Sequence, residues 1–245
     1  MSYLGLVRPI CNSFLKTIDN PKILEIGIDK GQTMLPMLQN LVSRHEAFIY
    51  VGVDILVRDD LLAQLQQFHD VSFVGLDPPA KKNLIIEQEN SLKWLADTNF
   101  YEDFKFDLVL LDGDHNYETV SQELQLLQRI IKPESIIVCD DFNGRWATKD
   151  LFYIEKEEYK NNNLATPKSK SEKEGVGTAI RDFVSQNEDW NYVDINPLEP
   201  AILYRSDVWQ QPNFFTLNSS NDIRTCQFSM NRLQPKGEDT ETHME

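Results

Sequence analysis

Two groups of acidic residues, each placed directly after an apolar run, are the residues of this sequence most able to do chemistry. The first run ends in Asp112-Gly113-Asp114-His115, and a later run ends in Asp140-Asp141. Apolar runs of this length are typical of buried strands, and ligands of α/β sheets collect outside the carboxyl ends of the strands. Carboxylates are the ligands that hard cations prefer. The pattern therefore predicts a divalent-cation site at one edge of an α/β sheet.

Each of these residues also has a structural interpretation. Asp114 could cap the helix expected from residue 117, and His115 could be a capping or surface residue. Asp140-Asp141 could be turn residues that end a strand. Because both groups stand at the ends of neighbouring strands, a shared role is favoured. We expect Asp112 to be a metal ligand and Asp114 to be a helix cap.

A second feature is a glycine-containing loop after the first expected strand. The chain reads Glu25-Ile26-Gly27-Ile28-Asp29-Lys30-Gly31 there. Two glycines let the backbone turn sharply and approach a ligand, and the amides of the helix that follows can hold a carboxylate or phosphate. The spacing is not the G-x-G-x-x-G of dinucleotide-binding proteins, which disfavours an NAD site. The alternative is that the glycines only make a tight βα turn.

The next apolar run, residues 47–54, ends in Asp54. An acid at this strand end can accept hydrogen bonds from both hydroxyls of a ribose. It could instead be a helix cap. The preceding glycine loop favours the nucleotide interpretation.

At this point the sequence resembles the class I S-adenosylmethionine-dependent methyltransferases, over roughly residues 22–204. Their third-strand motif often reads Gly-Asp-Ser, where this chain has Glu89-Asn90-Ser91. Asn90 thus stands where an acid commonly meets the adenine amino group, although an amide can still bond adenine. The resemblance implies that six residues bind the cofactor: Glu25, Gly27, Gly31, Asp54, Asn90 and Ser91.

A narrower resemblance, to the macrocin O-methyltransferase-like group, rests on residues 112–118, 140–142 and 175–180. It implies that Asp112, Asp140 and Asp141 bind Mg²⁺ and that His115 is the general base. The chemistry is consistent, because a hydroxyl bound to a cation becomes more acidic and is held in line with the sulfonium methyl. A histidine three residues past Asp112 could take the proton. The acceptor would be a small molecule or a sugar.

The composition sets limits on the class of protein. The chain has 245 residues, 41% of them hydrophobic, and a formal net charge of −15. We therefore expect one domain with insertions and no nucleic-acid partner, since nucleic-acid binders need a basic surface. Three scattered cysteines, no signal peptide and no run long enough to span a membrane lead us to expect a cytoplasmic protein with no membrane partner. A homo-oligomer formed through the apolar face of the first helix is a further possibility.

Strands alternate with helices along most of the chain. This order predicts an α/β fold, a Rossmann-like doubly wound and mostly parallel sheet with helices on both faces. We expect an N-terminal helix over residues 1–20 and a methyltransferase domain over 21–205. A lid-like inserted loop is expected at 143–175, and a polar, turn-rich tail at 206–245 whose last ten residues are disordered.

Two other functions are compatible with the sequence. Asp112-Gly113-Asp114 matches the short Asp-x-Asp motif of metal-dependent glycosyltransferases. A non-catalytic binding protein could also keep the methyltransferase fold, because a fold does not establish an activity. The acceptor would be determined by the 143–175 loop and the first helix. Aromatic residues near the acids could shape a pocket or pack in the core: Tyr117, Phe142, Trp146, Phe152 and Tyr153.

Overall fold

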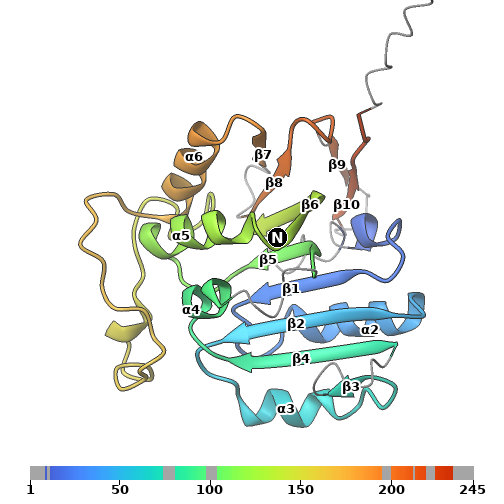
Figure 1. Ribbon diagram of the computed structural model, residues 1–245, viewed down its shortest axis with the longest axis horizontal. Coiled ribbons are helices and arrows are strands. Elements are labelled where there is room, and N and C mark those ends of the chain that lie inside the picture. The colour runs from blue at the N-terminus through green and yellow to red at the C-terminus, as the bar shows by residue number, and fades with distance from the viewer. Residues whose placement is uncertain are drawn as a thin grey trace, which may run out of the picture.

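The computed structural model of the chain describes residues 9, 12–73, 81–97, 104–194, 200–211, 213–218 and 224–233. Its central feature is an eight-stranded sheet with the order β3-β4-β2-β1-β5-β6-β8-β7 (Figure 1). The strands are β1 Lys22–Ile26, β2 Phe48–Asp54, β3 Ser72–Phe73, β4 Lys82–Gln88, β5 Phe106–Leu111, β6 Ile131–Cys139, β7 Trp190–Asp194 and β8 Ala201–Arg205.

Most strand pairs in this sheet are parallel. β8 is antiparallel to both β6 and β7, so β7 runs in the same direction as β6. β1 lies between β2 and β5, and the chain builds the sheet outward from it in both directions. The predicted doubly wound, mostly parallel sheet is confirmed. The strand order reverses beside β1, which is where such sheets bind ligands.

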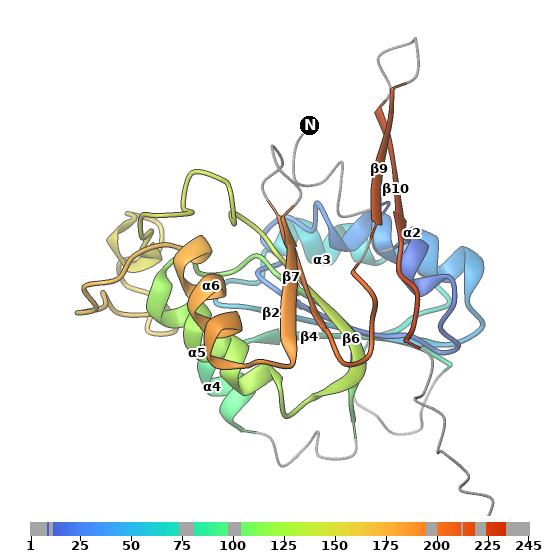
Figure 2. The same ribbon diagram turned by 90° about the horizontal axis from the view of Figure 1, so that it is seen from above.

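Helices cover both faces of the sheet. They are α2 Met34–Arg44, α3 Asp59–Leu65, α4 Ser91–Ala96, α5 Tyr117–Leu127 and α6 Val176–Gln186, with a short 3₁₀ helix, η2, at Tyr153–Glu155. Figure 2 shows α2 and α3 on one side of the sheet and α4 and α5 on the other. Two hydrophobic clusters fill the spaces between these layers.

Strand β5 shows why this arrangement forms. Its six residues are all buried, so the strand is covered on both faces. Leu108 and Leu110 belong to the cluster under α2 and α3, whereas Val109 and Leu111 belong to the cluster under α4, α5 and α6. Successive side chains of a strand point to opposite faces, and a continuous apolar run therefore feeds two cores at once.

The two ends of the chain differ from the central domain. Residues 12–15 of the expected first helix are helical, and most of the remainder lies outside the described residues, as do residues 234–245. The tail contains an antiparallel hairpin that we did not expect, formed by β9 Asn213–Asn218 and β10 Arg224–Ser229. Segment 213–218 contains Phe-Phe-Thr-Leu, residues that favour strands, within polar surroundings that obscured the pattern.

The insertion, residues 143–175, lies beside the carboxyl ends of β1, β2 and β4, where it is drawn in yellow at the left of Figure 1. These are the strand ends at which the sequence placed the cofactor residues. Among the described helices, none has the length and apolar character needed to cross a membrane. The fold thus brings the insertion to the sheet edge that carries the candidate site.

Candidate cofactor and metal site

A cavity of about 520 Å³ opens at the carboxyl ends of the central strands. Residues from 25–33, 53–58, 89–91 and 112–115 line it, so the ends of β1, β2, β4 and β5 all contribute. A fifth wall comes from residues 153–166 of the insertion. The structure therefore gathers five of the six predicted cofactor residues, all but Gly31, and the first acidic group around one space.

Gly27 connects these two groups. Its φ is +86°, and a Cβ built on it would lie 2.1 Å from the backbone oxygen of Asp112. Its amide donates to the carbonyl of Val53 at 2.9 Å, and the amide of Asp112 donates to the carbonyl of Ile26 at 2.9 Å. Only glycine fits a left-handed backbone pressed against another backbone. The glycine loop and the first acid are held in contact by this packing.

Gly31 contacts helix α3 and not the metal site. It has a φ of +70°, and a Cβ there would lie 2.4 Å from Leu61 Cδ1 on α3. It does not line the cavity. This glycine closes the turn before α2 and lets α3 pack against the loop.

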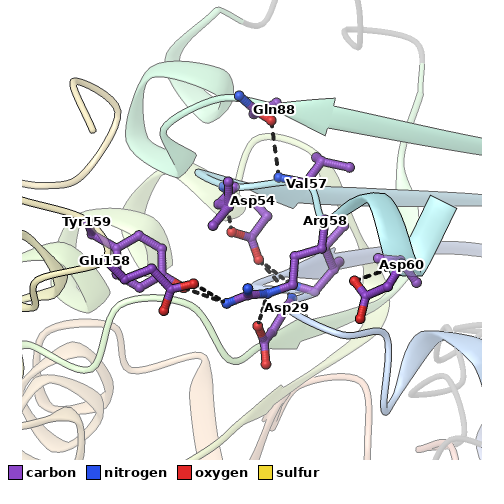
Figure 3. A network of polar contacts seen from close by, with 11 residues as sticks. Asp29, Asp54, Val57, Arg58, Asp60, Gln88, Glu158 and Tyr159 are labelled. Carbon is purple, nitrogen blue, oxygen red and sulfur yellow. Dashed lines mark hydrogen bonds and ion pairs between the residues drawn. The ribbon is translucent and has the colours of Figure 1, made fainter. Parts of the chain in front are cut away.

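Asp54 holds the glycine loop in shape. Its Oδ2 accepts hydrogen bonds from the amides of Ile28 at 2.8 Å and Asp29 at 2.9 Å. Its Oδ1 accepts from the amide of Leu56 at 2.9 Å, and Figure 3 shows the carboxylate at the end of β2. The residue capping α3 is Arg58, so Asp54 is not the helix cap of the alternative interpretation. Asp54 lines the cavity, and contact with a ribose stays a prediction.

Glu25 forms part of the cavity floor and is 2% exposed. Burial raises its pKa to about 8, the Tyr50 hydroxyl that donates to Glu25 Oε2 opposes the rise, and the charge of Asp54 adds to it. Glu25 is therefore mostly protonated at neutral pH. A neutral carboxyl group can both donate and accept a hydrogen bond.

Both the oxygen and the nitrogen of the Asn90 side-chain amide form hydrogen bonds within the protein. Its Oδ1 accepts from the Lys93 amide at 3.2 Å, which caps the start of α4. Its Nδ2 donates to the Leu164 carbonyl at 2.9 Å and to Thr166 Oγ1 at 3.1 Å, both in the insertion. Ser91 lies buried beside it and also lines the cavity. Bonding of adenine by Asn90 stays a prediction, and it would use the second lone pair of Oδ1, because Nδ2 already donates to the insertion.

Asp112, His115 and Asp140 each place one ligand atom within 4.8 Å of the others, and the first two also line the cavity. Burial, the neighbouring Asp140 carboxylate and a hydrogen bond to it raise the pKa of Asp112 well above its usual range. Two adjacent, partly buried carboxylates favour sharing either a proton or a cation, because their charges repel. Two carboxylates and an imidazole also suit a divalent cation that accepts oxygen and nitrogen ligands. The residues present fit a metal ion.

Asp141 is not part of that group of three. It has a φ of +55°, and its Oδ1 faces Gly144, where a Cβ would lie 1.8 Å from this oxygen. The amides of Arg145 and Trp146 also donate to the carboxylate. Its Oδ2 lies 3.2 Å from His115 Nδ1. The tight turn therefore directs the Asp141 carboxylate at the histidine, and its role as a metal ligand stays a prediction.

His115 is 9% exposed and lies between two acids. Its Nδ1 faces Asp141, and its Nε2 lies 3.8 Å from Asp112 Oδ1. Burial lowers the pKa of His115 to about 4, and the charge of Lys156 adds to this. The imidazole is thus neutral at physiological pH. If Nδ1 donates to Asp141, the lone pair of Nε2 is available for a proton or a metal ion.

The comparisons with known proteins fit this site. Residues 24–142 match a family model described as a methyltransferase domain. This match agrees with the resemblance of the chain to the class I S-adenosylmethionine-dependent methyltransferases. The motifs of the chain resemble those of the macrocin O-methyltransferase-like group, and the protein is an enzyme of the S-adenosylmethionine-dependent type. No curated protein sequence matched the chain.

Solved structures similar to this methyltransferase include CalS11, described as a TDP-rhamnose 3'-O-methyltransferase of calicheamicin biosynthesis. It is 13% identical, with a TM-score of 0.50 over 82% of this chain and 78% of that chain. At this identity the likeness shows the fold. MycE of the mycinamycin pathway, solved with Mg and S-adenosylhomocysteine, is 16% identical, with a TM-score of 0.46 over 84% of this chain and 51% of that chain.

Asp114 was expected to cap the helix after β5, and this prediction was wrong. The N-cap of α5 is Asn116, whose side chain accepts from the Thr119 amide at 2.8 Å. The Asp114 carboxylate instead accepts from the Thr119 hydroxyl at 3.4 Å. It also lies outside the group formed by Asp112, His115 and Asp140.

Several residues of the methyltransferase cavity were missed from the sequence. Lys156, Tyr159, Thr166 and Arg58 line it, together with Tyr153, which had been considered as a pocket residue. The available signal was the length of the insertion and its position after β6, since long loops at this edge of a sheet often bind ligands. No local motif distinguishes Arg58.

Proposed function

We propose that the chain is an S-adenosylmethionine-dependent O-methyltransferase that uses a divalent cation, Mg²⁺ by preference, and methylates a hydroxyl of a small molecule or sugar. One observation carries the proposal. A single cavity is lined both by Gly27 and Asp54, which are expected to bind the cofactor, and by Asp112 and His115, which are expected to act on the acceptor. A methyl donor held by the first pair and a hydroxyl held by the second would share this space.

The cofactor half depends on the glycine loop. Asp54 fixes the amides of Ile28 and Asp29, so the loop keeps its shape before the cofactor arrives. Preorganised polar groups lose little entropy on binding. Glu25, neutral at pH 7, could bond a polar group of the methionine part without adding negative charge to the cavity. Gly27 lets the loop pack directly against the backbone of Asp112, which keeps the cofactor loop beside the first acid.

The metal half depends on Asp112 and Asp140. These carboxylates, completed by water, would hold Mg²⁺, which prefers oxygen ligands. When bound, the ion supplies positive charge that makes a neighbouring hydroxyl more acidic. It would also relieve the repulsion between the Asp112 and Asp140 carboxylates. Asp141 then has a separate purpose, because it orients the His115 ring from the Nδ1 side.

The reaction itself needs a base and alignment. His115 Nε2 accepts the proton of the acceptor hydroxyl, and the oxygen forms a bond to the methyl carbon. The bond between that carbon and sulfur breaks, and its electron pair stays on sulfur, so the products are a methyl ether, S-adenosylhomocysteine and a proton on His115. The cavity holds both reactants close and in line, which removes much of the entropic barrier.

The metal assignment is tested by Mn²⁺ binding, followed by electron paramagnetic resonance as a substitute for Mg²⁺. We expect Asp112→Asn to weaken Mn²⁺ binding by roughly 5-fold to 150-fold, since removal of one charged ligand of a cation costs on the order of 1–3 kcal/mol. The exposed variant Asp60→Asn is the control. Calorimetry should show S-adenosylhomocysteine binding to Asp112→Asn within about two-fold of wild type. Equal Mn²⁺ affinity in wild type and Asp112→Asn would reject the metal assignment.

Turnover is tested with methyl-labelled S-adenosylmethionine and a panel of sugar and phenol hydroxyl acceptors, with Mg²⁺ or with EDTA. We expect methyl transfer by the wild-type protein with Mg²⁺ and not with EDTA, and we expect Asp112→Asn to lose this transfer. Equal transfer in EDTA would remove the cation from the reaction.

A further inference from the structure

Arg58 connects two walls of the cavity that are far apart in sequence. Its Nε donates to Asp29 Oδ1 at 2.6 Å, in the glycine loop. Its Nη2 pairs with Glu158 Oε1 at 2.8 Å and donates to the Tyr159 hydroxyl at 3.2 Å, both in the insertion. Figure 3 shows the guanidinium between these partners. One side chain therefore fastens the insertion to the loop expected to bind the cofactor.

The arrangement requires an arginine. A guanidinium presents several donors in a fixed plane and can bond partners on two sides at once, whereas an ammonium group is a single point charge. The Arg58 side chain is 22% exposed, so water partly screens these contacts. Asp29 is held from both directions, because Asp54 accepts from its amide and Arg58 donates to its carboxylate.

Two further connections join the insertion to the same region. Asn162 Nδ2 donates to the Ile55 carbonyl at 2.8 Å, just after β2. The Asn90 amide donates to Leu164 and Thr166, just after β4. These strand ends carry the residues expected to contact adenosine. The insertion is thus attached around the adenosine half of the cavity and not at a remote surface.

The attached segment also reaches the reactive end. Tyr159 is buried, and its ring meets the Tyr153 ring edge to face, with centroids 5.2 Å apart. The Tyr153 ring lies 6.3 Å from the His115 ring. Packed contacts therefore run from Arg58 through Tyr159 and Tyr153 to the candidate base.

We infer that Arg58 is a positioning residue: it holds residues 153–166 over the bound cofactor, slows cofactor release, and keeps Tyr153 beside His115. The inference rests on the proposed function, because it takes the occupant of the cavity to be S-adenosylmethionine. Release of the product cofactor then requires the contacts of Arg58 to break, so the residue influences both binding and turnover.

The test compares Arg58→Met with Lys160→Met. Methionine keeps a long apolar side chain but removes every contact of the guanidinium. Lys160 pairs with Glu157 inside the insertion, so its replacement removes an ion pair of the same segment without touching the sheet. We expect S-adenosylhomocysteine to dissociate roughly ten-fold faster from Arg58→Met, because the variant loses several polar contacts that are each weakened by solvent screening. Lys160→Met should dissociate at the wild-type rate.

Two further readouts separate positioning from general stability. Hydrogen exchange of residues 153–166 in the ligand-free protein should accelerate in Arg58→Met and not in Lys160→Met. The KM for S-adenosylmethionine should rise more than kcat falls, and Arg58→Lys should restore part of the loss. Should Arg58→Met unfold, Glu158→Met combined with Tyr159→Phe removes the contacts of Arg58 with the insertion from the other side and is expected to accelerate dissociation in the same direction.

Wild-type dissociation and exchange rates in Arg58→Met, or in the double variant, would overturn the inference while leaving the proposed function intact. If the wild-type protein fails to bind S-adenosylhomocysteine at all, the cofactor assignment and the release role are both rejected.

Discussion

The first prediction concerns Glu123, an acid inside the domain. It lies on α5 with no exposed surface. Burial raises its pKa to about 8; Ser91 opposes the rise and the charge of Asp114 adds to it. Glu123 is therefore protonated in the folded protein at pH 7, whereas in the unfolded chain it is ionised.

This difference makes the folded protein less stable as the pH rises. Between the ordinary value of 4.5 and about 8, the folded state binds a proton that the unfolded state has released, so the free energy of unfolding falls across this window. The loss amounts to about 1.4 kcal/mol per pH unit, and to roughly 3 kcal/mol at pH 7. Glutamine has the same shape and does not ionise. Glu123→Gln should therefore remove the loss.

The assay is urea unfolding of wild type and Glu123→Gln at pH 5, 6, 7 and 8. We expect similar stability at pH 5 and an advantage of about 3 kcal/mol for Glu123→Gln at pH 7. Glu118→Gln, which removes an exposed acid from the same helix, should leave the pH dependence of wild type unchanged. Parallel curves for wild type and Glu123→Gln would refute the reasoning, since they would mean that Glu123 has the same protonation state in the folded and unfolded protein.

Three further predictions concern the site. Gly27→Ala should lower the free energy of unfolding by at least about 2 kcal/mol in urea melts and abolish S-adenosylhomocysteine binding, because a Cβ would strike a backbone oxygen, whereas Gly113→Ala should be milder. Asp54→Asn should weaken S-adenosylhomocysteine binding roughly ten-fold by calorimetry, with Mn²⁺ affinity unchanged; an unaltered dissociation constant would remove Asp54 from the cofactor site. Asp141→Asn should lower kcat at least ten-fold while keeping Mn²⁺ affinity, because it disturbs the orientation of His115, and loss of Mn²⁺ binding would instead make Asp141 a ligand.

Sequence patterns predicted the sheet and the location of the site for a local reason. Each central strand is a short apolar run that is followed by a polar residue. The strand and the functional residue at its end are therefore neighbours in the sequence. Gly27, Asp54 and Asp112 were found in this way, and all three lie around one cavity. The parallel direction of the strands then determines that these ends meet at the same edge.

The remaining features depend on contacts between distant segments. The Asn90 amide forms hydrogen bonds to the insertion because residues 164–166 pass beside it. These residues have no periodic pattern from which their position could have been predicted. Likewise, Asp141 turns toward His115 because its backbone adopts a positive φ, which the Asp140-Asp141 pair does not reveal. Arg58 gains its role only when the insertion lies over the cavity.

The most direct test of the central claim is calorimetric titration of the wild-type protein with S-adenosylhomocysteine, with and without Mg²⁺. We expect one molecule of S-adenosylhomocysteine to bind per chain with and without Mg²⁺, because different residues form the cofactor site and the metal site. The absence of binding by S-adenosylhomocysteine, with S-adenosylmethionine also failing to bind, would contradict it.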